Sequence, residues 1–294
     1  MSTAWLTPAL INRLEVLELS VKAARAGHRL GGRFTVNRRG SSIEFADYAP
    51  YYAGDDIRSI DWSLYARLDK LFVKTYKEEI ALSVELLVDA TPSMRLPSSD
   101  KFLRANQLAV CLGYIALGDG HYVRTSWVAA DRLAPSPWYH QRSDLFRLAH
   151  QAEQTRVGAA VDVAEWIRRA AIALRMHGGQ AIYITDGMVR PAELFRALHV
   201  LQSRNVEMSV IQVITPQELH PRALATAGML VDAETGSTHQ LAYKPAELEQ
   251  AMASHNELLA RLCKRHGMKF AQYRTDQSLD TFITTTLPAR GFLE

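Results

Sequence analysis

Short apolar runs alternate along the chain with longer segments in which apolar residues recur at helical spacing. Val84–Val88 is rich in strand-forming residues and ends at Asp89, which is the pattern of a buried central strand. Ala181–Thr185 repeats this pattern and ends at a second acid, Asp186. Helical spacing is found in several of the intervening segments, at about 101–117, 161–176 and 245–266. This alternation predicts an α/β fold, with a mostly parallel central sheet and helices on both faces.

The pattern divides the chain into three parts. Residues 1–30 predict an N-terminal amphipathic helix that starts at Thr7 and Pro8 and packs on its own domain. Residues 31–80 contain short β-prone pieces among glycines, tyrosines and acids, which predict a small β-rich segment. Residues 81–294 carry the strand–helix alternation and form the main domain.

Composition narrows the class of protein. A net charge of +3 is too small to indicate nucleic-acid binding. The longest apolar run, Leu108–Leu117, is shorter than the ~20 residues that a membrane helix needs, and no signal peptide is evident. The two cysteines, Cys111 and Cys263, lack a metal-binding spacing and fit a reducing compartment. We therefore expect a cytoplasmic protein without a membrane span or a nucleic-acid partner.

Four side chains that carry oxygen atoms are the candidate functional residues. Asp89, Thr91 and Ser93 recur at every second position, so in an extended segment they point the same way. They follow a buried strand, and ligands of open α/β sheets bind at the carboxyl ends of strands. Asp186, at the end of a later strand, could meet them there. Carboxylates and hydroxyls suit a hard cation, so the pattern predicts a Mg²⁺ or Mn²⁺ site.

Two motifs carry a resemblance to known families. Asp89-x-Thr91-x-Ser93 resembles the metal-ion-dependent adhesion site of von Willebrand factor A domains. GDDIRSIDWSLYARLDKLFVKTYKEE, at Gly54–Glu79, is similar to the signature of a bacterial family called domain of unknown function 58. The likeness runs through about residues 28–294. Further stretches that share it are TDG at 185–187, TPQEL at 215–219, DAETG at 232–236 and RTDQSLDTFITTTLPARGFL at 274–293.

This resemblance implies a von Willebrand factor A-like, Rossmann-like domain in which Asp89, Thr91, Ser93 and Asp186 serve the metal. The family normally adds a threonine from a third loop, and Ala160 stands at about that position. The resemblance therefore implies a weak or degenerate site, with Thr155 and Asp162 as nearby substitutes. It also implies a MoxR-type AAA+ ATPase as partner. We accordingly expect a non-enzymatic protein-interaction module that serves this ATPase and a client protein.

Two alternatives stay open. Asp89 and Asp186 at strand ends also fit a magnesium-dependent phosphohydrolase of the haloacid dehalogenase type. Those enzymes use Asp-x-Asp, and Thr91 in place of the second acid cannot transfer a proton in the same way. The other alternative is a structural domain with a vestigial metal site.

The stretch at Gly54–Arg67 is expected to be mainly architectural, and a partner-binding surface is the alternative. Arginine–carboxylate pairs are geometrically specific and could lock this turn. Trp62 would then be an apolar plug. The charged residues concerned are Asp55, Asp56, Arg58, Asp61 and Arg67.

Overall fold

The structure is a computed structural model with two compact units. It describes residues 5–20, 27–30, 33–39, 44–131, 135–173, 179–220, 229–231, 238–240 and 245–294. One unit consists of Met1–Ser20 together with Leu82–Glu294, and the other is Val21–Ala81. The DAETG stretch at 232–236 lies outside the described residues.

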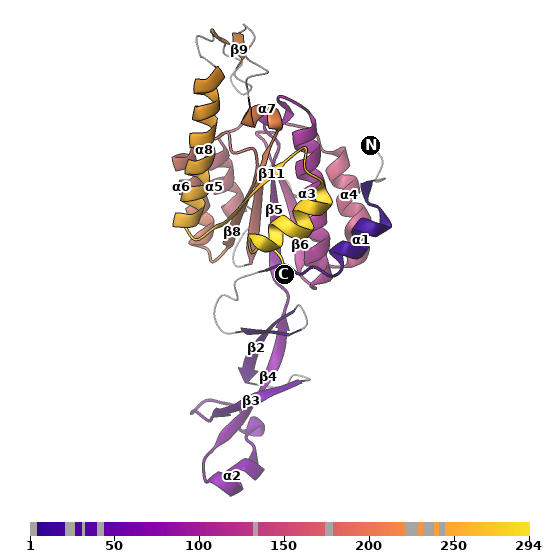
Figure 1. Ribbon diagram of the computed structural model, residues 1–294. Coiled ribbons are helices and arrows are strands. Elements are labelled where there is room, and N and C mark those ends of the chain that lie inside the picture. Colours follow the sequence, from indigo (N-terminus) through magenta and orange to yellow (C-terminus); the bar gives the residue numbers. More distant parts are fainter. Residues whose placement is uncertain are drawn as a thin grey trace. The chain divides into compact units, whose positions relative to one another are not determined.

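The larger unit is built on a five-stranded sheet with the strand order β11-β8-β7-β5-β6 (Figure 1). Every neighbouring pair in it is parallel, which confirms the predicted α/β class. The central position of β5 explains why its sequence is an almost unbroken apolar run, since both of its faces are covered. The strands are β5 (Ser83–Asp89), β6 (Tyr122–Val128), β7 (Gln180–Thr185), β8 (Glu207–Ile214) and β11 (Lys269–Arg274).

Helices cover both faces of this sheet (Figure 1). Neighbouring residues of β5 face opposite ways, as strand geometry requires. Leu86 lies next to Gly113 of α3, whereas Leu87 belongs to the apolar cluster on the side of α5 and α6. The longer helices of the unit are α3 (Asp100–Gly118), α4 (Leu145–Gln154), α5 (Val163–Ala173), α6 (Pro191–Gln202) and α8 (Pro245–Arg265).

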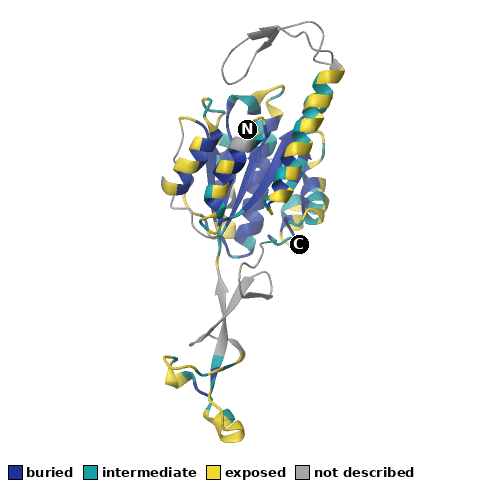
Figure 2. Cartoon of the chain, turned by 90° about the vertical axis from the view of Figure 1, so that its left-hand side faces the viewer, coloured by how far each residue is buried: buried dark blue, intermediate teal, exposed yellow. Residues whose placement is uncertain are grey.

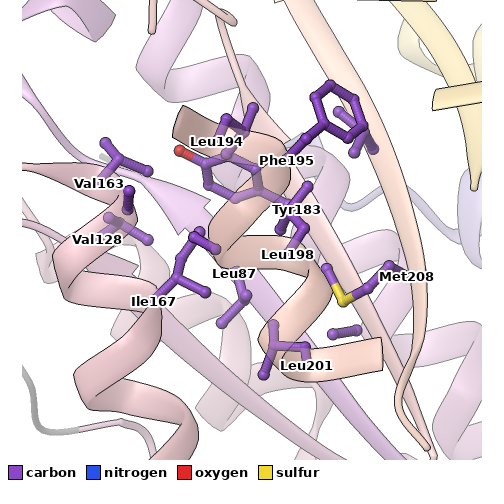
Figure 3. Close-up of a cluster of buried hydrophobic side chains, with 14 of the residues drawn as sticks. Leu87, Val128, Val163, Ile167, Tyr183, Leu194, Phe195, Leu198, Leu201 and Met208 are labelled. Carbon is purple, nitrogen blue, oxygen red and sulfur yellow. The ribbon is translucent and has the colours of Figure 1, made fainter. Parts of the chain in front are cut away.

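The cluster on the α5 and α6 side is the main apolar core (Figure 3). Tyr183 is fully buried in it, and Leu87, Ile167 and Leu198 pack around it from a strand and two helices. Burying each such large side chain contributes about 1.5–3 kcal/mol, so this packing fixes the relative positions of the strands. In Figure 2 the strands of this sheet are coloured as buried, whereas the helices around it carry exposed residues.

Short elements complete the unit. They are α1 (Pro8–Leu14), α7 (Pro216–Leu219), α9 (Leu279–Thr281), α10 (Leu287–Ala289), the 3₁₀ turns η3 (Pro92–Arg95) and η4 (Arg142–Asp144), the π-helical turn η6 (Phe282–Thr286), and the paired strands β9 (Met229–Val231) and β10 (Thr238–Gln240).

The N-terminal helix is shorter than the 1–30 segment predicted for it. Thr7 caps α1 through a hydrogen bond from the Leu10 N–H, as expected, but the helix ends at Leu14. Beyond it, Leu19 forms a β-bridge with Leu293 and donates its N–H to a carboxylate oxygen of Asp119 at 2.7 Å. These tertiary contacts use the backbone groups that a longer helix would need.

The smaller unit contains the predicted β-rich segment. Its antiparallel sheet has the order β1-β2-β4-β3. Between β3 and β4 the chain forms the 3₁₀ turn η2 (Ile57–Ser59) and the helix α2 (Trp62–Leu68). The strands are β1 (Gly27–Leu30), β2 (Arg33–Arg39), β3 (Glu44–Pro50) and β4 (Phe72–Ile80).

Two predictions for Gly54–Arg67, the apolar plug at Trp62 and the arginine–carboxylate pairs, are wrong. Trp62 is 59% exposed, so it is not an apolar plug. Arg58 forms no carboxylate pair within the described part of the chain, because the aspartates there accept local backbone N–H groups instead. Asp56 accepts from Arg58 N–H, and Asp61 from two N–H groups of α2, at 2.9–3.0 Å. Such contacts join groups that are only two or three residues apart, and they compete with longer-range pairing of the same carboxylates.

Gly179, just before β7, provides a test of the sheet's register. Its φ of +76° is left-handed, and a Cβ there would lie 2.1 Å from the carbonyl oxygen of Ser83 in β5. We predict that Gly179→Ala lowers the free energy of unfolding by about 3 kcal/mol or more, measured by urea denaturation. Gly267 is the matched control, because its φ is +67° and nothing lies within 4 Å of the added Cβ. Gly267→Ala should cost about 1–2 kcal/mol, and equal losses would contradict the contact described for Gly179.

Candidate functional site

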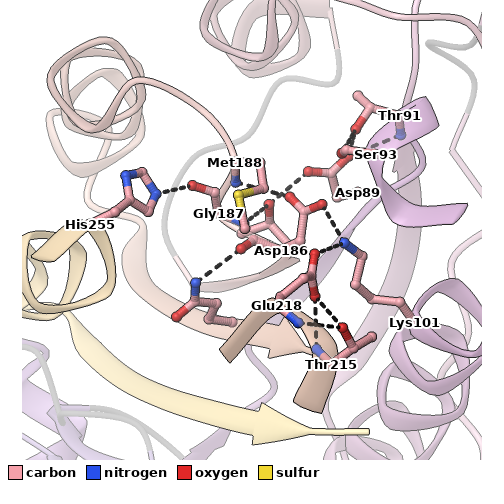
Figure 4. A network of polar contacts seen from close by, with 12 residues as sticks. Asp89, Thr91, Ser93, Lys101, Asp186, Gly187, Met188, Thr215, Glu218 and His255 are labelled. Atoms are coloured by element: carbon pink, nitrogen blue, oxygen red, sulfur yellow. Dashed lines mark hydrogen bonds and ion pairs between the residues drawn. The ribbon is translucent and has the colours of Figure 1, made fainter. Parts of the chain in front are cut away.

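Asp89, Thr91 and Ser93 come together at the carboxyl end of β5 (Figure 4). One oxygen of Asp89 accepts hydrogen bonds from the Thr91 hydroxyl at 2.7 Å and from the Thr91 N–H at 3.0 Å. The Thr91 and Ser93 hydroxyls are 3.0 Å apart. Thr91 is extended, but Ser93 already belongs to η3. The turn, rather than a continued strand, therefore brings the third side chain to the other two.

The second oxygen of Asp89 is held by the neighbouring strand β7. It accepts hydrogen bonds from the Thr185 hydroxyl at 2.7 Å and from the Tyr183 hydroxyl at 3.0 Å. Asp89 is 1% exposed. Burial raises the pKa of the Asp89 carboxyl, and the nearby Asp186 carboxylate raises it further, while the bonds from Thr185 and Thr91 act in the opposite direction. Four donors thus fix a carboxyl group that has little access to water.

Asp186 follows β7 and forms an ion pair that was not predicted. One of its oxygens lies 2.9 Å from the ammonium nitrogen of Lys101, in the first turn of α3. The same ammonium lies 2.6 Å from Glu218, in α7 (Figure 4). Lys101 is 1% exposed. The other oxygen of Asp186 accepts the Met188 N–H at 3.0 Å, which fixes the loop after β7.

The Lys101 ammonium stays charged in this environment. Burial lowers its pKa, but the Asp186 and Glu218 carboxylates raise it by more, so the net shift is upward. Glu218 is itself positioned by a capping box, in which its second oxygen accepts the N–H and hydroxyl of Thr215 at 2.8 and 2.9 Å. The loops after β7 and β8 and the start of α3 therefore meet at one buried positive charge.

The third loop expected for the site also lies at this edge. The Gly158 N–H donates to the carbonyl of Ala90, the residue after Asp89, at 2.8 Å. Ala160 offers no side-chain oxygen. The two suggested substitutes serve helix ends instead. The Thr155 hydroxyl donates to the Gln151 carbonyl in α4, and Asp162 accepts the Glu165 N–H at the start of α5.

The four predicted ligands fit a divalent cation only in part. Their oxygens are of the right kind, and the Thr91 hydroxyl lies within hydrogen-bond distance of both the Asp89 carboxylate and the Ser93 hydroxyl. At Asp186, however, the Lys101 ammonium already balances the charge. Within the described ranges, no group of three or more His, Cys, Asp or Glu residues could hold a metal ion. The Mg²⁺ or Mn²⁺ site stays a prediction, and Lys101 is the group with which a cation would compete.

A family comparison agrees with the sequence resemblance. Residues 47–259 match the family described as "Protein of unknown function DUF58". The chain belongs to this family. The match includes the GDDIRSIDW stretch of the smaller unit and the strand-end residues Asp89 and Asp186 of this DUF58 protein.

Relatives and solved structures with similarity to this DUF58 protein are distant. Uncharacterized protein Rv1480 of Mycobacterium tuberculosis is 25% identical over 278 residues, which cover 92% of this chain and 86% of the relative. The crystal structure of BatB from Bacteroides thetaiotaomicron has a TM-score of 0.40 at 17% identity, covering 71% of this chain and 98% of BatB. A von Willebrand factor type A structure from Catenulispora acidiphila has a TM-score of 0.37 at 17% identity, covering 63% and 43%.

The described helices of this DUF58 protein include none that is both long and apolar enough to cross a membrane.

Sequence reasoning missed Lys101 and Glu218, although each had a signal. Lys101 shares helical spacing with Ala105, Leu108 and Leu112, which places it on the buried face of α3. Glu218 is the fourth residue of Thr-Pro-Gln-Glu, a capping-box pattern.

The competition between Lys101 and a cation can be tested directly. We predict that Lys101→Ala lowers the free energy of unfolding by about 3–5 kcal/mol, because it leaves two carboxylates without their buried partner. Millimolar Mg²⁺ or Mn²⁺ should then raise the melting temperature of this variant by mass action, but not that of the wild type. Differential scanning fluorimetry with and without each cation measures both effects.

Lys264→Ala is the matched control, because Lys264 is exposed in the last turn of α8. It should change stability by less than about 0.5 kcal/mol and create no response to cations. A cation-dependent rise of the wild-type melting temperature that Asp89→Ala abolishes would show that the metal binds in spite of Lys101.

Proposed function

We propose that this DUF58 protein is a non-enzymatic protein-interaction module that acts as an adaptor of a MoxR-type AAA+ ATPase in cytoplasmic assembly or chaperone-like work. The ATPase follows from the family resemblance. The manner of contact follows from the site, whose acids are held by internal hydrogen bonds and by Lys101. In this proposal the adhesion site is degenerate, and a lysine ammonium takes the role of the cation at Asp186.

The observation that carries the non-enzymatic proposal is the state of Asp89. Both of its oxygens accept hydrogen bonds, from Thr91 on one side and from Tyr183 and Thr185 on the other. A carboxylate saturated in this way is a poor nucleophile, because attack requires the loss of several buried hydrogen bonds. Thr91, at the position of the second acid of a phosphohydrolase, donates its hydroxyl to Asp89. This arrangement favours a binding module over the phosphohydrolase.

The rim of the edge provides the contact surface. Leu96 is 49% and Met188 36% exposed, and Arg95 is also exposed. They follow β5 and β7, which are neighbours in the sheet. An apolar rim with an arginine suits a partner that presents an apolar segment with a carboxylate. In this way a partner acid could be recognised without a metal.

The cysteines support the cytoplasmic part of the proposal. Cys111 and Cys263 are free and buried. Burial raises the pKa of both thiols, that of Cys263 to about 12, so both remain protonated and unreactive. Free buried thiols are typical of proteins from reducing compartments.

The proposal predicts that the purified chain binds the MoxR-type ATPase of its own organism through this edge. Met188→Glu should weaken binding at least tenfold, because it places a charge in an apolar contact and repels a partner carboxylate. Fluorescence anisotropy with the labelled chain measures the affinity. Phe146→Glu is the control. Phe146 is 60% exposed in the first turn of α4. The loop at 157–161, which contacts the carboxyl edge through Gly158 and Ala90, follows the other end of that helix.

If the wild-type chain does not bind the ATPase, the proposed partner is wrong. If it binds and Met188→Glu matches the wild type, the ATPase contacts another surface. In both cases the melting temperature of Met188→Glu should equal that of the wild type, because the side chain is exposed.

A further inference from the structure

A cavity of about 360 Å³ lies in the larger unit between the neighbouring helices α3 and α4 (Figure 1). Leu103 and Val110 line it from α3, and Ala149 and Ala152 line it from α4. Trp5, from the stretch before α1, also contributes to the lining. Ligand sites have volumes of about 300–1,000 Å³, so this cavity is large enough to hold a small organic molecule.

Several polar groups that line the cavity already have hydrogen-bond partners within the chain. The Asn106 amide accepts the Trp127 indole N–H at 2.8 Å and donates to the Phe102 carbonyl at 3.0 Å. The Thr155 hydroxyl donates to a carbonyl of α4 at 2.9 Å. The surface left to a ligand is therefore largely apolar, and it includes the aromatic rings of Trp5 and Phe102.

Glu153 is the exception among the polar groups of the lining. One of its carboxylate oxygens is buried and has no hydrogen-bond partner among the residues that the structure describes. A buried acceptor without a partner is costly, because it has lost its water and gained nothing in exchange. Since Glu153 lies at the wall of the cavity, a donor on a ligand could form the missing bond. The carboxylate therefore favours a ligand with an O–H or N–H group.

The charged residues that line the cavity balance one another. Arg95 and Arg156 are positive, whereas Asp100 and Glu153 are negative. All of them except Glu153 are exposed, so water and salt screen their charges. Neither a cation nor an anion is favoured by this set, which argues for a ligand without net charge.

We propose that this cavity binds a small, neutral aromatic molecule that carries one hydrogen-bond donor. The ring of the ligand packs against Trp5 and Phe102, and the apolar side chains of α3 and α4 shield it from water. Its donor pairs with the unpaired oxygen of Glu153. A substituted indole or phenol has these properties. The proposal is independent of the ATPase, because it rests on the cavity alone.

The test compares indole with 1-methylindole, in which a methyl group replaces the donor hydrogen. Isothermal titration calorimetry on the full chain measures both affinities. We expect indole to bind at one site with a dissociation constant below about 1 mM. It should bind about tenfold more tightly than 1-methylindole, because a hydrogen bond to a charged acceptor contributes about this factor.

Three variants locate the binding. Glu153→Leu removes the acceptor, so it should bind indole and 1-methylindole with equal affinity. Gln154→Leu is the matched control, because Gln154 is the next residue of α4, is exposed and does not line the cavity. It should keep the wild-type preference for indole. Ala152→Leu places a larger side chain in the cavity and should weaken the binding of indole at least tenfold.

The proposal is wrong if indole does not bind, if 1-methylindole binds equally well, or if Ala152→Leu leaves the affinity unchanged. Tighter binding of tryptamine or of indole-3-acetate than of indole would also overturn it, because the cavity would then select a charged ligand. The melting temperature of each variant is measured in parallel. If Ala152→Leu melts below the wild type, Glu153→Leu and Gln154→Leu decide the matter, and an equal preference for indole in these two variants contradicts the proposal.

Discussion

The buried ammonium of Lys101 is the charge on which the carboxyl edge of the sheet depends. It lies between Asp186 and Glu218, and Asp89 is close enough for the Asp186 carboxylate to raise its pKa. Without a cation, three acids could not gather in a place so poorly exposed to water, because desolvation and mutual repulsion would both oppose their ionisation. The lysine comes from α3, so the helix that covers the sheet also supplies the charge for the loops beside it.

The degenerate site proposed above needs no side-chain oxygen at position 160. An ammonium needs two or three acceptors and a short path from its own helix, whereas Mg²⁺ needs an octahedral set of ligands, some of which can be waters. Asp186 and Glu218 supply these acceptors, and the loop at Gly158 packs against Ala90 through its backbone. Thr155 and Asp162 are then free to end one helix and start the next. The positive charge at this edge is thus supplied by the chain itself, through Lys101.

The two units present different kinds of surface. In the larger one, charge is buried and the rim is apolar with an arginine. In the smaller one, carboxylates cap local turns while aromatic and aliphatic side chains point outward. Two chemically distinct surfaces on one chain are compatible with the adaptor role proposed above, in which the chain holds two proteins at once.

The sequence by itself determined the α/β class, because alternating strands and helices can bury their apolar faces in few other ways. It also placed Asp89 and Asp186 at one edge, since parallel strands end on the same side. It did not determine the partners of these acids. Lys101 is 85 residues from Asp186 and 117 from Glu218, and no local pattern encodes a pairing over such distances. Likewise, Trp62 looked like a core residue, and its exposure followed from the tertiary structure. The periodicity of a chain reports which side chains share a face, but what covers that face depends on how distant segments pack.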